Sequence, residues 1–219
     1  MENKTMKKID KTKWLGLKHY EWFKKYSIHF YSLTCEMDVT KLYYYIKENK
    51  LSFFITFMYF VNKGMDQVLE LRLREIDDEV YEFEKINPAY TVMTKDGVFD
   101  NCESEAGDNF KEYYENAKEA IEIVKNGLNV EKSYNDFTRL DRYFFTCLPW
   151  IDFKALTHPM SDDVTKTVPR VAWGKYVIKD EKVLISLNIQ VSHMLVDGYP
   201  LSQAFNNIQE MLNTLDLLK

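Results

Sequence analysis

The chain of 219 residues carries a formal net charge of −5 and three cysteines. A chain of this length can bury about 70% of the surface that it exposes when unfolded, so it can form one sizeable domain without disulfides or a metal ion. The negative net charge does not suggest binding to nucleic acid. The most apolar run, residues 53–61, is too short to span a membrane, and the N-terminus lacks the apolar h-region of a secretory signal. The spacing of the cysteines and histidines predicts free thiols in a cytoplasmic protein that binds no metal.

Apolar periodicity predicts the elements in chain order. After a polar arm (residues 1–13), spacings of three and four residues indicate helices over residues 14–26, 38–49, 52–69, 109–124 and 200–215. Alternation of apolar and polar residues indicates strands over residues 28–37, 88–93, 98–101, 141–150, 171–178 and 183–193. Residues 70–81 are expected to form short strands joined by an acidic turn at residues 76–79. A polar loop is expected over residues 151–169. Because most strands are joined by short turns, we predict an α+β fold: a two-layer α/β sandwich with a mixed, mostly antiparallel sheet, in a single domain over residues 1–219.

The stretch from residue 182 to residue 215 carries the most information. Apolar residues alternate with polar ones from Ile185 to Val191, which predicts a strand, and His193 follows in the apolar register. A turn at Asp197-Gly198 leads into the last helix, with Pro200 suited to its first position. An imidazole at the end of a buried strand is held by the sheet and can open into a cleft. A lone histidine in such a place is more often structural than catalytic, so His193 alone does not indicate an enzyme.

Residues 190–199, QVSHMLVDGY, resemble the active-site signature of the chloramphenicol acetyltransferase family, QVHHxxxDG followed by an aromatic residue. Further stretches look like the same family at residues 14–20, 31–34, 146–150 (TCLPW, similar to SALPW) and 169–176. The resemblance therefore covers nearly the full length. It implies a homotrimer of two-layer α/β subunits with active sites between neighbours, where one subunit supplies the catalytic histidine and the other much of the acceptor pocket.

The same resemblance implies roles for individual residues. His193 matches the general base, Thr146 matches the serine whose hydroxyl donates to the oxyanion, and Asp197 matches the aspartate of the signature. The residues expected to contact the acceptor, chloramphenicol, are Phe23, His29, Tyr31 and Phe99. Those expected near the co-substrate, acetyl-CoA, are Trp150, Lys175 and Tyr176. An ordinary strand role for Thr146, a core role for the aromatic residues and a solvated surface role for Lys175 are the simpler alternatives.

Several positions depart from the family's pattern. In the family an arginine near the N-terminus pairs with the signature aspartate, and counting from Trp14 puts Gly16 at that position here. Asp197 therefore needs another cation, for which Lys18 and Arg142 are candidates. Further family residues are replaced at Ser52, Phe54, Ala172, Ser192 and Pro200. The base and an oxyanion hydroxyl are retained, while the residues that support them differ.

Three functions are open at this point. The first is transfer of an acetyl group from acetyl-CoA to a hydroxyl of chloramphenicol. The second is acyl transfer to a different alcohol or thiol, because dihydrolipoamide acyltransferases share the expected fold and a related His-x-x-x-Asp-Gly motif. The third, favoured by the altered supporting residues, is a non-catalytic trimer that binds ligands without turnover.

Overall fold

The computed structural model describes residues 6–127, 139–160 and 165–218. Within these ranges the main sheet has seven strands, in the order β2-β10-β8-β7-β5-β6, with β9 also paired to β10. The strands are β2 (Phe30–Asp38), β5 (Asn87–Met93), β6 (Phe99–Glu103), β7 (Arg142–Cys147), β8 (Arg170–Trp173), β9 (Val177–Lys179) and β10 (Lys182–Ser192). Neighbouring strands are antiparallel except for β5–β7 and β7–β8, which are parallel. The predicted mixed, mostly antiparallel sheet is confirmed.

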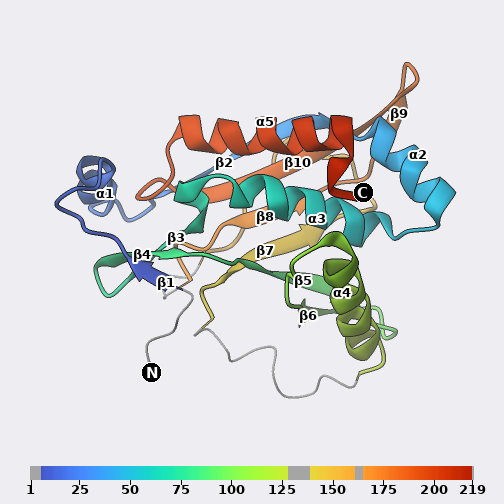
Figure 1. Cartoon of the computed structure of the whole chain (residues 1–219), viewed down its shortest axis with the longest axis horizontal. Coiled ribbons are helices and arrows are strands. Elements are labelled where there is room, and N and C mark those ends of the chain that lie inside the picture. Colours follow the sequence, from blue (N-terminus) through green and yellow to red (C-terminus); the bar gives the residue numbers. More distant parts are fainter. Residues whose placement is uncertain (1–5, 128–138, 161–164, 219) are drawn as a thin grey trace.

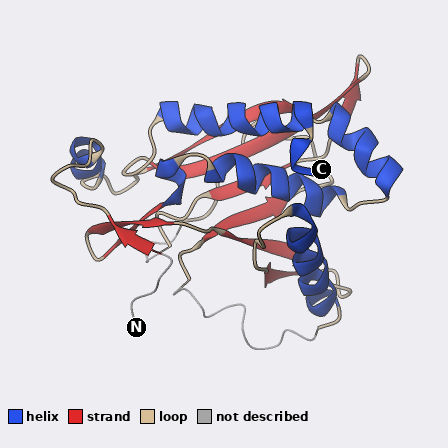
Figure 2. Cartoon of the chain, viewed as in Figure 1, coloured by secondary structure: helices blue, strands red, loops and turns tan. Residues whose placement is uncertain are grey.

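Helices cover one face of this sheet and form the second layer (Figure 1, Figure 2). The longest contact between helices joins α3 (Phe53–Asp66) to α5 (Gly198–Thr214), and α4 (Phe110–Lys125) covers β5 and β6. The helix α2 (Thr40–Asn49) contacts the ends of α3 and α5. The short helix α1 (Leu17–Phe23) stands apart, at the end of the sheet where β2 begins and β10 ends (Figure 1).

A second, smaller sheet ties the N-terminal arm to the rest of the chain. It has the order β1-β4-β3, from β1 (Met6–Lys8), β3 (Leu73–Ile76) and β4 (Glu79–Phe83). The backbone continues this pairing, because the Ile9 amide donates to the Val80 carbonyl at 2.8 Å. Part of the segment that the sequence predicts as a polar arm is therefore a strand that pairs within its own chain.

The strand predicted over residues 171–178 is broken into β8 and β9 at Gly174. The Gly174 amide donates to the Ser186 carbonyl at 3.1 Å, but the next amide, of Lys175, donates to the Ile151 carbonyl at 2.8 Å. A Cβ atom at residue 174 would lie 2.7 Å from that carbonyl oxygen, so glycine is needed for this close approach. The break fastens the segment after β7 to the start of β9, and thereby holds Trp150 and Lys175 near one another.

Both faces of β10 are buried, although its alternating pattern is typical of a strand with one solvated face. The apolar side chains join the core beneath the helices. The polar side chains lie under residues 151–160 and are bonded to that segment: Ser186 Oγ to Asp152 Oδ1 at 2.9 Å, Asn188 Nδ2 to the Leu156 carbonyl at 3.1 Å, and the His158 amide to Gln190 Oε1 at 3.0 Å. This segment is the described part of the polar loop expected before residue 161.

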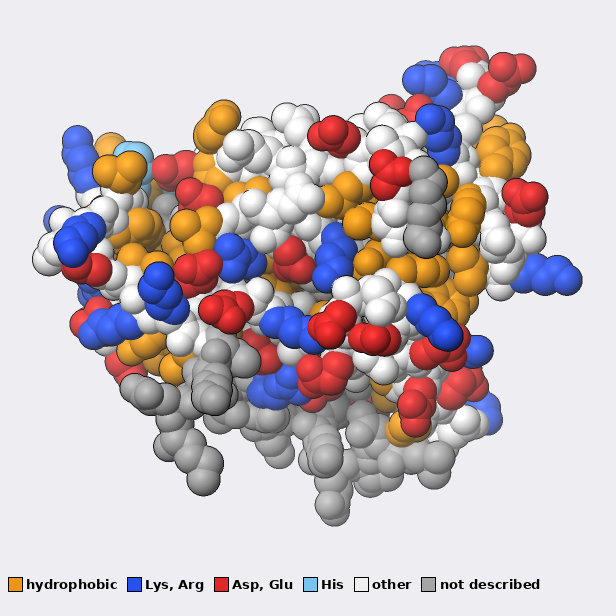
Figure 3. Space-filling view, in the orientation of Figure 1, with side chains coloured by type: hydrophobic (Ala, Val, Ile, Leu, Met, Phe, Trp, Pro, Cys, Tyr) orange, Lys and Arg blue, Asp and Glu red, His pale blue; other side chains and the backbone are white. Residues whose placement is uncertain are grey.

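The helix-covered face mixes charges of both signs, with no broad basic or acidic patch (Figure 3). Across the described ranges, no helix combines the length and the apolar composition needed to cross a membrane.

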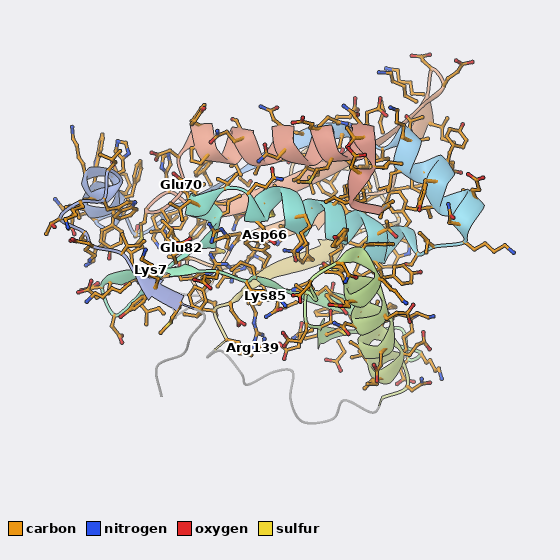
Figure 4. The ribbon with its side chains drawn as sticks, viewed as in Figure 1. Lys7, Asp66, Glu70, Glu82, Lys85 and Arg139 are labelled. Carbon is orange, nitrogen blue, oxygen red and sulfur yellow. The ribbon has the colours of Figure 1, made fainter. Side chains whose placement is uncertain are left out.

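A partly buried carboxyl group, with one oxygen shielded from solvent, lies between the C-terminal end of α3 and the sheet (Figure 4). This group belongs to Asp66, whose Oδ2 accepts a hydrogen bond of 3.1 Å from Asn62 Nδ2. Burial raises the pKa of Asp66 to about 6, against the opposing effect of the nearby Lys63 and Arg72. Its neighbour Arg74 is fully buried and donates to the backbone carbonyls of Leu71, Leu73, Leu140 and Arg142.

The raised pKa of Asp66 predicts a pH-dependent free energy of unfolding. The pKa of this carboxyl is near the ordinary 3.8 in the unfolded chain and about 6 in the folded chain. Its contribution to stability is therefore fully present below pH 3.8 and is lost as the pH rises through about 6. We therefore expect Asp66→Asn to gain about 2–3 kcal/mol relative to wild type between about pH 4 and pH 7. Urea unfolding of both proteins measures this gain, and a difference independent of pH would contradict the assignment.

Candidate active site

His193 is placed by the backbone at the end of the sheet. It follows the last residue of β10, and its amide donates to the His29 carbonyl at 2.6 Å, which extends the β2–β10 pairing by one step. The next three residues, Met194, Leu195 and Val196, bury their side chains in the core. The turn that carries the imidazole is therefore anchored on both sides.

Two aromatic rings predicted for the acceptor pocket contact the His193 imidazole. Phe23, at the end of α1, stacks on it with ring centroids 3.9 Å apart and an angle of 16° between the planes. Tyr31 of β2 meets it at 4.7 Å and 40°. The Nδ1 atom of His193 is buried, whereas the side chain as a whole is 32% exposed, so the exposed surface belongs to other atoms of the side chain. The imidazole is thus oriented with Nδ1 toward the interior.

The Asp197 carboxylate lies against two imidazoles. Its Oδ1 is 3.2 Å from Nδ1 of His193, within ion-pair distance but without hydrogen-bond geometry. Its Oδ2 accepts a hydrogen bond of 2.9 Å from Nδ1 of His19 on α1. Because an ionised carboxylate only accepts hydrogen bonds, this contact requires the proton of His19 to be on Nδ1.

The cations considered from the sequence are not the ones that the fold brings to Asp197. Arg142 lies on β7 and pairs with Glu103 at 2.9 Å, and within the described ranges the ion pairs of Asp197 are those with His19 and His193 rather than with Lys18. Sequence reasoning missed His19. The available signal was its position four residues before Phe23 on a predicted helix, which puts both side chains on one face.

His29 and Tyr31 hold the end of β10 and the loop after it in place. The Nδ1 atom of the buried His29 lies at a hydrogen-bond distance of 2.9 Å from Ser192 Oγ, so the His29 ring is beside the end of β10. The Tyr31 hydroxyl donates to the Val196 carbonyl at 3.3 Å. Burial, with a smaller effect of the Asp197 charge, raises the pKa of Tyr31, so this hydroxyl keeps its proton and remains a donor.

Thr146 does not meet His193 within one chain. Strand register pairs Thr146 with Ala172, and Ala172 with Asn188, so Thr146 is two strands away from β10 and level with a residue well before its end. With a rise of about 3.3 Å per residue and strands about 4.8 Å apart, Thr146 and the end of β10 are separated by about 15 Å. Phe99 is further still, on the edge strand β6 with 60% of its surface exposed.

The three residues predicted near the coenzyme lie at the other end of β10. Trp150 and Lys175 are exposed, and Tyr176 contacts the rings of Tyr43 at 5.3 Å and Phe53 at 5.5 Å. Tyr176 lines an open groove of about 310 Å³ together with Tyr43, Ile46, Lys47, Lys50, Leu51 and Phe53. Apolar side chains gather beside α2 in this part of the surface (Figure 3).

The groove contains two lysines that sequence reasoning missed, Lys47 of α2 and Lys50 just after it. Two of the replaced family positions have structural roles nearby. Ser52 caps α3 and its amide donates to the Tyr114 hydroxyl at 2.8 Å, while Phe54 contacts Trp173 with ring centroids 5.3 Å apart. The positive charge in the groove therefore comes from the last turn of α2 and the residue just after it.

Two other kinds of reactive group in the described residues are thiols and possible metal ligands. Burial raises the pKa of the Cys147 thiol to about 12, so this cysteine is not a thiolate nucleophile. In the described part of the chain, no three His, Cys, Asp or Glu side chains converge as metal ligands.

Comparison with known proteins identifies the family. The family model described as chloramphenicol acetyltransferase matches residues 4–209. The chain is 26% identical to a chloramphenicol acetyltransferase of Bacillus pumilus over 96% of this chain and 94% of that protein, and 28% identical to one of Clostridium perfringens over 85% of each. A solved structure of a chloramphenicol acetyltransferase, 18% identical, superposes with a TM-score of 0.80 over 94% of this chain and 99% of the other. A probable dihydrolipoamide acetyltransferase from Listeria monocytogenes, 16% identical, gives a TM-score of 0.65 over 90% and 89%. The chain therefore belongs to the chloramphenicol acetyltransferase family.

Proposed function

We propose that this protein transfers the acetyl group of acetyl-CoA to a hydroxyl of chloramphenicol, with His193 as the general base. The observation that carries the proposal is the orientation of the His193 imidazole, whose Nδ1 is buried beside Asp197 while the side chain as a whole is 32% exposed. A ring held in this way can accept a proton at Nε2 from a hydroxyl that approaches its exposed side. The names of the relatives support the choice of acceptor.

The reaction needs a base and an oxyanion donor but no acyl-enzyme. Nε2 of His193 takes the proton of the acceptor hydroxyl as its oxygen attacks the thioester carbonyl, so a C–O bond forms. The Thr146 hydroxyl donates to the oxyanion of the tetrahedral intermediate. When the intermediate collapses, the C–S bond breaks and the thiolate of coenzyme A takes the proton back from His193. The protonated, buried Cys147 thiol has no part in these steps.

The active site is completed by a second copy of the chain. The separation of about 15 Å between Thr146 and the end of β10 prevents one chain from supplying both the base and the oxyanion donor. The exposed Phe99, on the opposite edge of the sheet, has the same difficulty. In a homotrimer with head-to-tail contacts, His193 of one subunit would face Thr146 and Phe99 of its neighbour, with Phe23 and Tyr31 beside the base.

The groove beside α2 suits the nucleotide end of acetyl-CoA. It combines the aromatic faces of Tyr43, Phe53 and Tyr176 with the ammonium groups of Lys47 and Lys50. An adenine ring can stack on such faces, and phosphate oxygens accept hydrogen bonds from lysine. Trp150 and Lys175, near Tyr176, extend this surface toward β7 and Thr146.

The first test is release of free coenzyme A thiol from acetyl-CoA, with and without chloramphenicol. We expect turnover that depends on chloramphenicol, and a loss of at least about 10²-fold in His193→Ala because the base is gone. Binding of acetyl-CoA to the variant is the control. If wild type binds acetyl-CoA but gives no turnover with chloramphenicol, the acceptor is a different alcohol or thiol. Failure to bind either ligand would favour a non-catalytic protein.

The second test removes the Thr146 hydroxyl without changing the shape of the side chain. Thr146→Val should lower kcat about 10²- to 10³-fold, because the oxyanion loses a donor, whereas Thr146→Ser keeps a hydroxyl and should retain most of the activity. Steady-state kinetics of both variants measures the difference. Equal activity of Val and Ser variants would rule out an oxyanion role.

The same variants test whether sites are shared. Co-expression of His193→Ala and Thr146→Val chains in equal amounts should restore about one quarter of the wild-type sites, because random mixing places an intact His193 opposite an intact Thr146 at that frequency. A site built within one chain would give no restoration. A protein that runs as a monomer at micromolar concentration would contradict the shared site directly.

The third test concerns the groove. Changing Lys47 and Lys50 together to Gln should raise the KM for acetyl-CoA on the order of 10-fold with little change in kcat, because the lysines contact phosphates far from the reacting carbonyl. The matched control is Lys41→Gln, also on α2, whose ammonium donates to the Asn213 carbonyl outside the groove. An unchanged KM for acetyl-CoA in the double variant would remove the groove from the coenzyme site.

A further inference from the structure

The helix α1 reaches the loop of the base with two side chains one turn apart. His19 and Phe23 lie on one face of this helix, because residues four apart are neighbours on a helix surface. His19 contacts Asp197 at 2.9 Å, and Phe23 stacks on His193 at 3.9 Å. The base and the carboxylate beside it are therefore both in contact with the same turn of α1.

The Asp197 carboxylate could bond to the N-terminus of α5 instead of to the imidazoles. Asp197 is the N-cap residue of α5, where an aspartate ordinarily accepts a hydrogen bond from the second or third amide of its helix, yet it makes no such bond here. The third helical residue is Pro200, which has no amide proton to offer. Tyr199 at the second position is then the remaining donor of this kind.

The carboxylate therefore has two alternatives, the Tyr199 amide or the imidazoles. In the structure it bonds to His19 through Oδ2, which leaves Oδ1 at Nδ1 of His193. Asp197 is 40% exposed and His19 is 49% exposed, so the pair contributes little to the free energy of folding. Its effect is to orient the carboxylate.

We propose that His19 is a positioning residue for the base, which holds the Asp197 carboxylate at Nδ1 of His193 and away from the N-terminus of α5. The inference rests on the proposed role of His193. The negative charge of the carboxylate, 3.2 Å from Nδ1, favours a proton on that nitrogen and leaves Nε2 free to accept one. Loss of His19 releases the carboxylate toward the Tyr199 amide, and His193 loses the charge that favours this tautomer.

The experiment compares three substitutions of His19 with a control on the same helix. The amide nitrogen of Asn can take the place of Nδ1, whereas that of Gln takes the place of Nε2, so Asn alone preserves the contact with Asp197. We expect His19→Ala and His19→Gln to lower kcat about 10- to 100-fold with KM for both substrates within about twofold, and His19→Asn to stay within about threefold of wild-type kcat. Lys18→Ala, at the neighbouring exposed position, should leave the kinetics unchanged.

A second measurement does not depend on activity. Hydrogen exchange at the Tyr199 amide, followed residue by residue, should slow in His19→Ala as the carboxylate turns to this amide, and should stay as in wild type in His19→Asn. Wild-type kcat in His19→Ala, or unchanged exchange at Tyr199, would overturn the inference. Equal losses of kcat in the Asn and Gln variants would also overturn it. Absence of turnover in wild type would instead count against the proposed function, while the exchange measurement still tests the hold on Asp197.

Discussion

The pairing of β2 with β10 is the constraint on which the site depends. The register runs from Leu184 opposite Asp38 to Ser192 opposite Phe30, and the His193 amide adds one more hydrogen bond to the His29 carbonyl. His193 is therefore located by backbone groups, which every residue type except proline can supply. Side chains around it can differ from the family's pattern without moving the imidazole.

The elements that could be predicted are those with strong periodicity over many residues. The alternation in β10 and the three- and four-residue spacing in α5 indicate their structure without any knowledge of neighbours. The break at Gly174 could not be predicted, because it depends on the Ile151 carbonyl, which approaches from another part of the chain. The short strand β1 is exposed along its length and has no apolar pattern to reveal it.

The residues of the candidate site also differ in whether a local sequence pattern reveals them. His193 and Asp197 could be found because both belong to one local motif. The contact of His19 with Asp197 could not, because the two residues are 178 positions apart and an exposed imidazole on a helix has the pattern of a surface residue. Its spacing from Phe23 indicates only that the two side chains share a helix face. Lys47 and Lys50 were missed for a related reason: no local motif marks them, and only the fold brings them beside Phe53 and Tyr176.

The place of β2 in the sheet has a consequence for biosynthesis. Within the described sheet, β2 is an edge strand whose neighbour is β10, the last strand of the chain. As the chain leaves the ribosome, β2 therefore waits without a partner until nearly all other elements have been translated, and an unpaired strand is a template for aggregation. Closure of this late, long-range pairing is also the step that places the His193 imidazole, so a nascent chain cannot assemble the candidate site before its sheet is complete.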